Sequence, residues 1–141
     1  MVIITAWQRD ARIDARVPAM QRHILSNDHI HPAAQAIIAA NHRDIVEEVQ
    51  AAIASNDVVI VGMKQNPVPA KARKILKARG TTFKYLEFGS YLNTWRRRTA
   101  LKMWSGWPTF PMIFVKGTLI GGCEDLEKLL ADGEFDRLLG K

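Results

Sequence analysis

Cysteine is nearly absent from this chain of 141 residues, which contains a single one, Cys123. One cysteine excludes an intramolecular disulfide and a metal site built from several thiolates. It is also typical of a reducing compartment, so we expect a cytoplasmic protein. Long apolar runs are missing too. No segment approaches the about eighteen apolar residues that a membrane-spanning helix needs, so we expect no membrane association.

The first 31 residues lack both helical and strand periodicity. Their apolar start precedes the charged residues, which is the reverse of a secretory signal. Asp10 and Asp14 lie among the arginines there, which argues against a transit peptide. We expect residues 1–31 to be a partly irregular extension, with Met20 as an alternative start, and residues 32–141 to form one domain that includes an N-terminal helix.

Positive charge is concentrated in the second part of the chain, whose net charge is +6 overall. Residues 1–54 contain five Lys/Arg against six Asp/Glu, whereas residues 55–141 contain fifteen against eight. This excess predicts an anionic ligand or an acidic partner for the second part. A solvated basic surface would have the same composition.

Helices and strands are predicted to alternate from residue 32 onward. His31-Pro32 suits a helix start, and the apolar residues that follow predict one helix over 33–54. Its apolar face contains Ile38, Ile45, Val49 and Ile53. The β-branched run at 58–63 predicts a strand buried on both faces. The other predicted elements are a helix at 68–79, a strand at 82–88, a helix at 91–104, a hairpin of 112–115 with 118–120, a helix at 124–131 and a further turn or two at 134–139.

The order of these elements predicts an α/β fold. A strand–helix–strand start implies a parallel pair of strands with a right-handed crossover. The hairpin about Lys116-Gly117 adds an antiparallel pair. Together these pairs form a four-stranded mixed sheet with helices on both faces.

A long motif near the C-terminus resembles one known family. Residues 107–111 read Trp-Pro-Thr-Phe-Pro, an apolar strand and Lys-Gly follow, and residues 121–124 read Gly-Gly-Cys-Glu. This order resembles the C-terminal half of monothiol glutaredoxins. The resemblance covers about residues 42–140 and implies a thioredoxin-like four-stranded mixed sheet flanked by helices, here with an extra N-terminal helix.

The resemblance fails at the active-site loop. Dithiol glutaredoxins have Cys-Pro-Tyr-Cys there and monothiol members have Cys-Gly-Phe-Ser, whereas residues 66–69 of this chain read Asn-Pro-Val-Pro. Asn66 therefore stands at the position of the nucleophilic cysteine, and an amide cannot attack a disulfide. Asn66-Pro67 can also be interpreted simply as a helix cap followed by proline at the first helical position.

The resemblance also implies a glutathione-binding surface. In the family, the residue before a cis-proline pairs its backbone with the tripeptide, cations meet the glycyl carboxylate, and a helix start holds the γ-glutamyl carboxylate. Pro111 is the cis-proline candidate, and Glu124 stands where the family has the shorter aspartate. The predicted glutathione-binding residues are Lys64, Arg98, Lys102, Thr109, Phe110, Pro111, Gly122, Cys123 and Glu124.

We therefore expect a glutaredoxin-like protein without ordinary thiol–disulfide oxidoreductase activity that binds glutathione or an acidic partner protein as a monomer or weak dimer. Cys123 has two interpretations: a small structural residue, or a reactive thiol that supports redox or iron–sulfur chemistry. A [2Fe–2S] cluster is not expected, because Asn66 removes the usual protein thiolate.

Nucleic-acid binding is a third alternative, because Trp95 and Trp104 lie near the arginines at 96–98. Three successive arginines point around a helix rather than along one stripe, so a solvated face or an acidic partner is favoured over nucleic acid.

Overall fold

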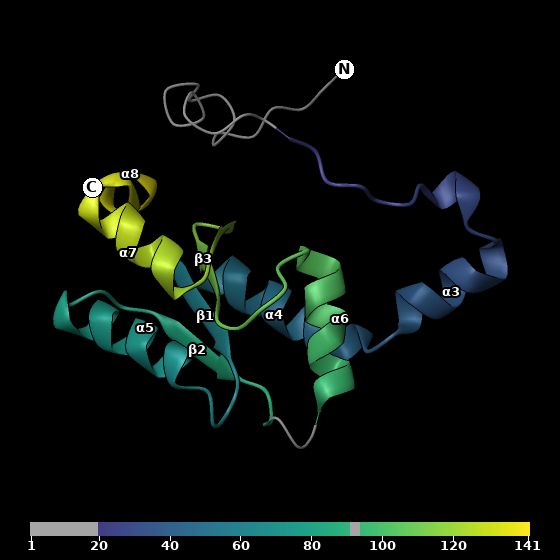
Figure 1. Ribbon diagram of the computed structural model, residues 1–141, viewed down its shortest axis with the longest axis horizontal. Coiled ribbons are helices and arrows are strands. Elements are labelled where there is room, and N and C mark those ends of the chain that lie inside the picture. The colour runs from purple at the N-terminus through teal and green to yellow at the C-terminus, as the bar shows by residue number, and fades with distance from the viewer. Residues whose placement is uncertain (1–19, 91–93) are drawn as a thin grey trace. The chain divides into compact units, whose positions relative to one another are not determined.

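The computed structural model describes residues 20–90 and 94–141 (Figure 1). The chain divides into two compact units, with the boundary between Ile37 and Ile38. In the first unit, Ser26 caps a short 3₁₀ helix, η1 (Asn27–His29). Helix α3 (Pro32–Ala40) begins at the predicted proline, where the His31 ring nitrogen Nδ1 accepts a hydrogen bond from the Ala33 N–H at 3.0 Å.

The prediction of one continuous helix over 33–54 is wrong. Helix α3 ends at Ala40 and a separate helix, α4 (Arg43–Ser55), follows. His42 lies between them with a φ of 45°, a left-handed conformation that interrupts the helical path. Ile45 is fully buried, whereas Ile38 is 52% exposed, so the buried face belongs to α4 and not to the helix before it.

The predicted four-stranded mixed sheet is confirmed, with strand order β2-β1-β3-β4. Strand β1 pairs in parallel with β2 and antiparallel with β3, and β3 pairs antiparallel with β4. The β3–β4 connection is the predicted turn, in which Lys116 and Gly117 both have positive φ. The strands are β1 (Val58–Gly62), β2 (Lys84–Glu87), β3 (Met112–Val115) and β4 (Thr118–Gly121).

Helices cover both faces of the sheet, as the unbroken β-branched run of β1 predicts (Figure 1). Val59 and Val61 face one core, which contains buried residues of α4 and of α6 (Trp95–Ser105). Val58 and Ile60 face the other core, with α5 (Pro67–Ala78), α7 (Cys123–Ala131) and α8 (Glu134–Leu138). The predicted start of α6 at 91–93 lies outside the described residues.

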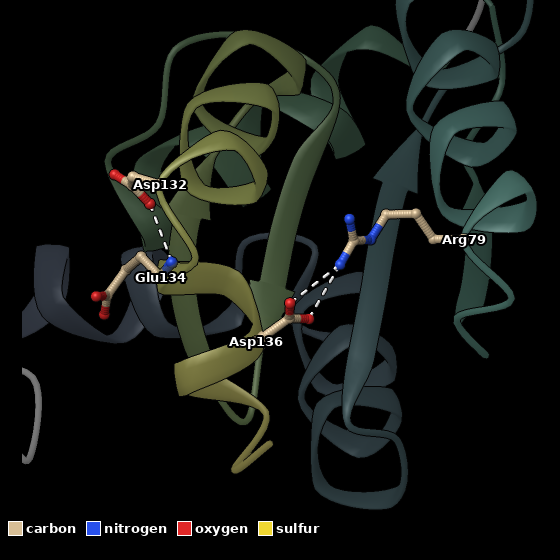
Figure 2. Close-up of polar contacts among 4 residues, drawn as sticks. All are labelled: Arg79, Asp132, Glu134 and Asp136. Carbon is tan, nitrogen blue, oxygen red and sulfur yellow. Dashed lines mark hydrogen bonds and ion pairs between the residues drawn. The ribbon is translucent and has the colours of Figure 1, made fainter.

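The C-terminal helix α8 is only five residues long and depends on tertiary contacts. Phe135 is fully buried in the second core. Figure 2 shows polar contacts of α8 and of the turn before it: Arg79, at the end of α5, contacts both carboxylate oxygens of Asp136 at 3.1 Å, and Asp132 accepts the Glu134 N–H at 3.0 Å. The ion pair is exposed, so the burial of Phe135 is the main source of stability.

Within the described ranges, no helix is both long and apolar enough to cross a membrane.

Candidate functional site

The predicted site residues gather at one edge of the sheet. The pairing of Gly62 with Glu87, of Val61 with Met112 and of Ile113 with Gly121 places the ends of β1, β2 and β4 beside the start of β3. In mixed α/β sheets, ligands commonly bind beyond the carboxyl ends of the parallel strands. Loops at this edge contain five of the nine predicted residues, α6 contains Arg98 and Lys102, and the start of α7 contains Cys123 and Glu124.

Asn66 caps helix α5 and also ties it to the neighbouring loop. Its side-chain oxygen accepts the Val68 N–H at 3.0 Å, and its amide nitrogen donates to the Phe110 carbonyl at 3.3 Å. Pro67 is the first helical residue, which confirms the capping interpretation. The amide thus contacts the residue before Pro111, where the predicted glutathione edge lies, but it contains no group that can become a nucleophilic thiolate.

The start of α5 packs closely against the end of β1, where the residue is a glycine. A Cβ added to Gly62 would lie 2.7 Å from the Cβ of Pro69 and 3.0 Å from the hydroxyl of Tyr85. The absence of a side chain at Gly62 therefore sets how closely the capped helix approaches the end of β1. This contact fixes the position of Asn66 relative to the strand.

The peptide bond between Phe110 and Pro111 is cis, as predicted. Pro111 is buried, and the Phe110 side chain is 7% exposed. The Lys102 ammonium lies 5.7 Å from the centre of the Phe110 ring, so this predicted cation comes from α6 to the predicted backbone edge. Thr109 is exposed one residue earlier.

Lys64 and Arg98 lie on the same side of this edge but differ in burial. Lys64 has an exposed side chain, and its backbone N–H donates to the Gly89 carbonyl at 2.7 Å. Arg98 is only 5% exposed, and its Nη1 donates to the Phe88 carbonyl at 3.1 Å. Arg98 therefore holds the chain that follows β2, while Lys64 presents its charge to solvent.

The Gly-Gly pair builds the start of α7. Gly121 has a φ of +110°, and a Cβ there would lie 2.5 Å from the Asp125 carboxylate. That carboxylate accepts the Gly122 N–H at 2.9 Å. A Cβ on Gly122 would lie 3.5 Å from the Pro111 carbonyl, so the helix start adjoins the cis-proline. Sequence reasoning missed Asp125, although an acid three residues into a helix is a capping signal.

Cys123 is 4% exposed, and its thiol lies 3.8 Å from a carboxylate oxygen of Glu127. Burial raises the pKa of the Cys123 thiol, and the negative charge of Glu127 raises it further, although Lys71 opposes these effects. Lys71 forms an ion pair with Glu127 at 2.9 Å. A buried neutral thiol suits the structural interpretation of Cys123 better than the reactive one. Glu124, beside it, is exposed.

Comparisons with known proteins bear on this geometry. A family model described as Glutaredoxin matches residues 58–120. A "Glutaredoxin-like protein" of Dictyostelium discoideum is 50% identical over 92 residues, which cover 65% of this chain and 75% of that protein. The chain belongs to the glutaredoxin family. "Glutaredoxin 4" of Buchnera aphidicola is 31% identical over 101 residues, covering 68% of this glutaredoxin and 92% of the relative.

Solved structures agree with the fold of this glutaredoxin. A wheat glutaredoxin has a TM-score of 0.59 at 28% identity, covering 68% of this chain and 91% of its own. A buckwheat glutaredoxin–glutathione complex has a TM-score of 0.60 at 20% identity, covering 71% and 91%. The fold is thus α/β and thioredoxin-like, with additional N-terminal helices.

The arginines at 96–98 of this glutaredoxin point in three directions. Arg97 forms an ion pair with Asp44 of α4 at 2.8 Å, and Arg96 lies 5.1 Å from the ring centre of Trp95. Arg98 is buried, as described above. The predicted absence of a single basic stripe is therefore confirmed for α6.

A [2Fe–2S] cluster does not fit the described residues of this glutaredoxin. Cluster iron requires thiolate ligands. The one thiol, that of Cys123, is buried beside a carboxylate, and Asn66 offers an amide. Across the described part of the chain, no group of three His, Cys, Asp or Glu side chains lies close enough together to hold a metal ion.

Proposed function

We propose that this protein is a non-catalytic glutaredoxin that docks glutathione at the edge formed by Asn66, Phe110 and Gly122. The observation that carries the proposal is the hydrogen bond from Asn66 to the Phe110 carbonyl. It places an amide, which cannot form a mixed disulfide, beside the backbone that the family resemblance assigns to the tripeptide. Docking is retained in this proposal, whereas thiol exchange is lost.

The charges around this edge support binding of a peptide with two carboxylates. Lys64, in the loop after β1, and Lys102, on α6, contribute positive charge from different elements. The buried Arg98 adds positive charge, but its guanidinium already donates a hydrogen bond to the Phe88 carbonyl. The start of α7 offers backbone N–H groups to the other carboxylate, as helix N-termini do for anions. Glu124 and Asp125 oppose this attraction, so we expect weak binding.

Calorimetric titration with reduced glutathione tests the proposal. We expect binding in the millimolar range that Lys102→Glu weakens by about tenfold, because one cation becomes an anion beside the ligand carboxylate. Arg98→Glu is unsuitable because it would place a carboxylate in a buried position and unfold the protein.

Lys128→Glu is the matched control, since it makes the same charge change at an exposed position on α7. No heat of binding with millimolar glutathione would refute the proposal. Equal weakening of binding by both variants would indicate non-specific electrostatic attraction and would also contradict the proposal.

A redox or cluster function through Cys123 is a weaker candidate. The thiol is buried and its pKa is raised, whereas both functions need an accessible thiolate. Nucleic-acid binding through α6 is also disfavoured, because Arg97 and Arg98 are engaged within the protein.

A further inference from the structure

All charged residues of helix α5 are basic. Between Pro67 and Ala78 it contains Lys71, Arg73, Lys74 and Lys77 and no acidic residue. Two of these cations are engaged: Lys71 pairs with Glu127, and the Arg73 guanidinium lies 4.0 Å above the Tyr85 ring.

Lys74 and Lys77 are both exposed, and in the described part of the chain neither forms an ion pair. They leave a local excess of positive charge on the solvent side of the helix. This excess is part of the positive half of the sequence and is not used by the proposed glutathione site.

These lysines border a shallow hollow on the helix surface. Pro67, Ala70, Lys74 and Lys77 follow one another at spacings of three and four residues, so they share one face. The hollow has a volume of about 460 Å³, and Lys71 and Arg73 complete its lining. Small apolar residues therefore form its end near Asn66, and lysines form the rest.

We propose that this α5 surface binds an acidic, extended segment of a partner protein. The proposal extends the docking function above by adding a second contact region beside the glutathione site. The hollow begins at Pro67, directly after Asn66, so a segment seated on it would lead toward the proposed docking edge. Its carboxylates would meet Lys74 and Lys77, and a small side chain would cover Ala70.

The surroundings of the hollow favour a short acidic peptide over nucleic acid. Helix α5 has twelve residues and is about 18 Å long, which about six residues of extended peptide can span. Glu124 and Glu127 of α7 lie on one side, where Glu127 already holds Lys71, and a long polyanion would meet these acids. Among the residues that the structure describes, no aromatic ring lines the hollow, so nucleic-acid bases have no stacking partner there.

Fluorescence anisotropy of the full chain tests the proposal, with a fluorescein-labelled peptide of alternating glutamate and glycine as the probe. We expect binding at low ionic strength that salt weakens steeply, because exposed charges are screened. The double variant Lys74→Glu/Lys77→Glu should weaken binding by about tenfold or more. Both side chains are exposed, and a thermal melt checks that this variant remains folded.

The matched control is Lys84→Glu/Lys141→Glu, which changes the net charge equally. Lys84 lies on the opposite face of β2 from Tyr85, and Lys141 is the last residue. The control should weaken binding by less than about threefold. Equal losses in both double variants, or no peptide binding at low salt, would overturn the proposal.

Two further measurements separate the alternatives. A single-stranded oligonucleotide of similar charge that binds as tightly as the peptide would overturn the choice of a protein partner. Glutathione titration of Lys74→Glu/Lys77→Glu should match that of the wild type, since these lysines lie outside the docking edge. Loss of peptide binding with retained glutathione binding would support the α5 surface, and failure of glutathione binding alone would refute only the first proposal.

Discussion

Helices α5 and α7 both begin at the same edge of the sheet, and each follows a glycine at the end of a strand. Gly62 ends β1 before α5, and Gly121 ends β4 before α7. The start of α5 has a half-buried amide, Asn66, at its cap, whereas the start of α7 has the protein's thiol, Cys123, as its first helical residue. Asn66, at the partly exposed helix start, has no sulfur, whereas Cys123, which has the thiol, is buried.

A position at a helix N-terminus does not by itself lower the pKa of a thiol. The helix dipole contributes about 0.3–1 kcal/mol to stabilising a nearby anion. Burial opposes the charged form by as much as several pKa units in fully buried groups. At Cys123 burial and the Glu127 carboxylate together outweigh the opposing charge of Lys71, so the pKa of the thiol is raised.

The largest expected effect is a gain of activity in Asn66→Cys. A thiol at this cap would face the Val68 N–H and be activated by the helix start. We expect exchange with a glutathione mixed disulfide at least about a hundredfold above the wild-type rate. The reaction is followed by coupled reduction of the released glutathione disulfide.

Two controls accompany this variant. Asn66→Ser keeps a capping oxygen without sulfur and should remain inactive. Combining Asn66→Cys with Cys123→Ser should leave the gained activity unchanged. If the combination abolished activity, Cys123 would be part of the mechanism and the contrast between the two helix starts would fail.

A structural loss of intermediate size is expected for Gly121→Ala. The new Cβ would meet the Asp125 carboxylate at 2.5 Å in a backbone conformation that favours glycine. We expect the free energy of unfolding to fall by about 2–3 kcal/mol, measured by urea denaturation. Gly133→Ala, with a similar positive φ and open space around it, is the control for backbone strain alone. Equal losses in the two variants would show that contact with Asp125 is unimportant.

Alkylation provides a smaller and more direct comparison of the two positions. In the Asn66→Cys protein, iodoacetamide should modify one thiol quickly in the native state and the second only after unfolding, because Cys123 is 4% exposed. Mass spectrometry of peptides identifies the modified position. Rapid native modification of Cys123 in the wild type would contradict the buried-thiol interpretation.

The smallest expected effect is a change in stability at acid pH when Glu127 is replaced. The ion pair with Lys71 lowers the pKa of the Glu127 carboxyl, so its contribution to stability is present above the ordinary carboxyl pKa and is lost as pH falls through the lowered value. Glu127→Gln should therefore flatten the acid side of the stability–pH curve slightly. Both partners are exposed, which keeps the effect small. If the stability of Glu127→Gln depended on acid pH as that of the wild type does, the Lys71–Glu127 ion pair would not contribute to the stability of the protein.

The sheet could be predicted from the sequence because its signals are local. The run at 58–63 has few conformations besides a buried strand, and Lys116-Gly117 suits a tight hairpin turn. The prediction of one helix over 33–54 is wrong because contacts with the rest of the fold, which the local pattern does not show, decide where the helices end. Its alanine-rich first half has the right periodicity, but only the residues of α4 pack on the sheet, and His42 breaks the path between them.

The site could be predicted in part, through the family motif. The cap at Asn66 and the cis bond before Pro111 agree with expectation. The burial of Arg98 and the role of Asp125 could not be read from spacing. Arg98 binds a carbonyl at the end of another strand, and Asp125 matters because Gly121 leaves room for its carboxylate. Contacts between distant segments decide both.

The double hydrogen bond of Asn66 has a consequence for how this protein can change in evolution. Its amide accepts from one helix turn and donates to the neighbouring loop, and a thiolate could perform only the first task. Replacing Asn66 with cysteine would thus keep an acceptor at the helix cap but lose the hydrogen bond to the Phe110 carbonyl, at a cost of about 1 kcal/mol. A protein with little stability to spare would therefore need a compensating substitution before this position could change to cysteine.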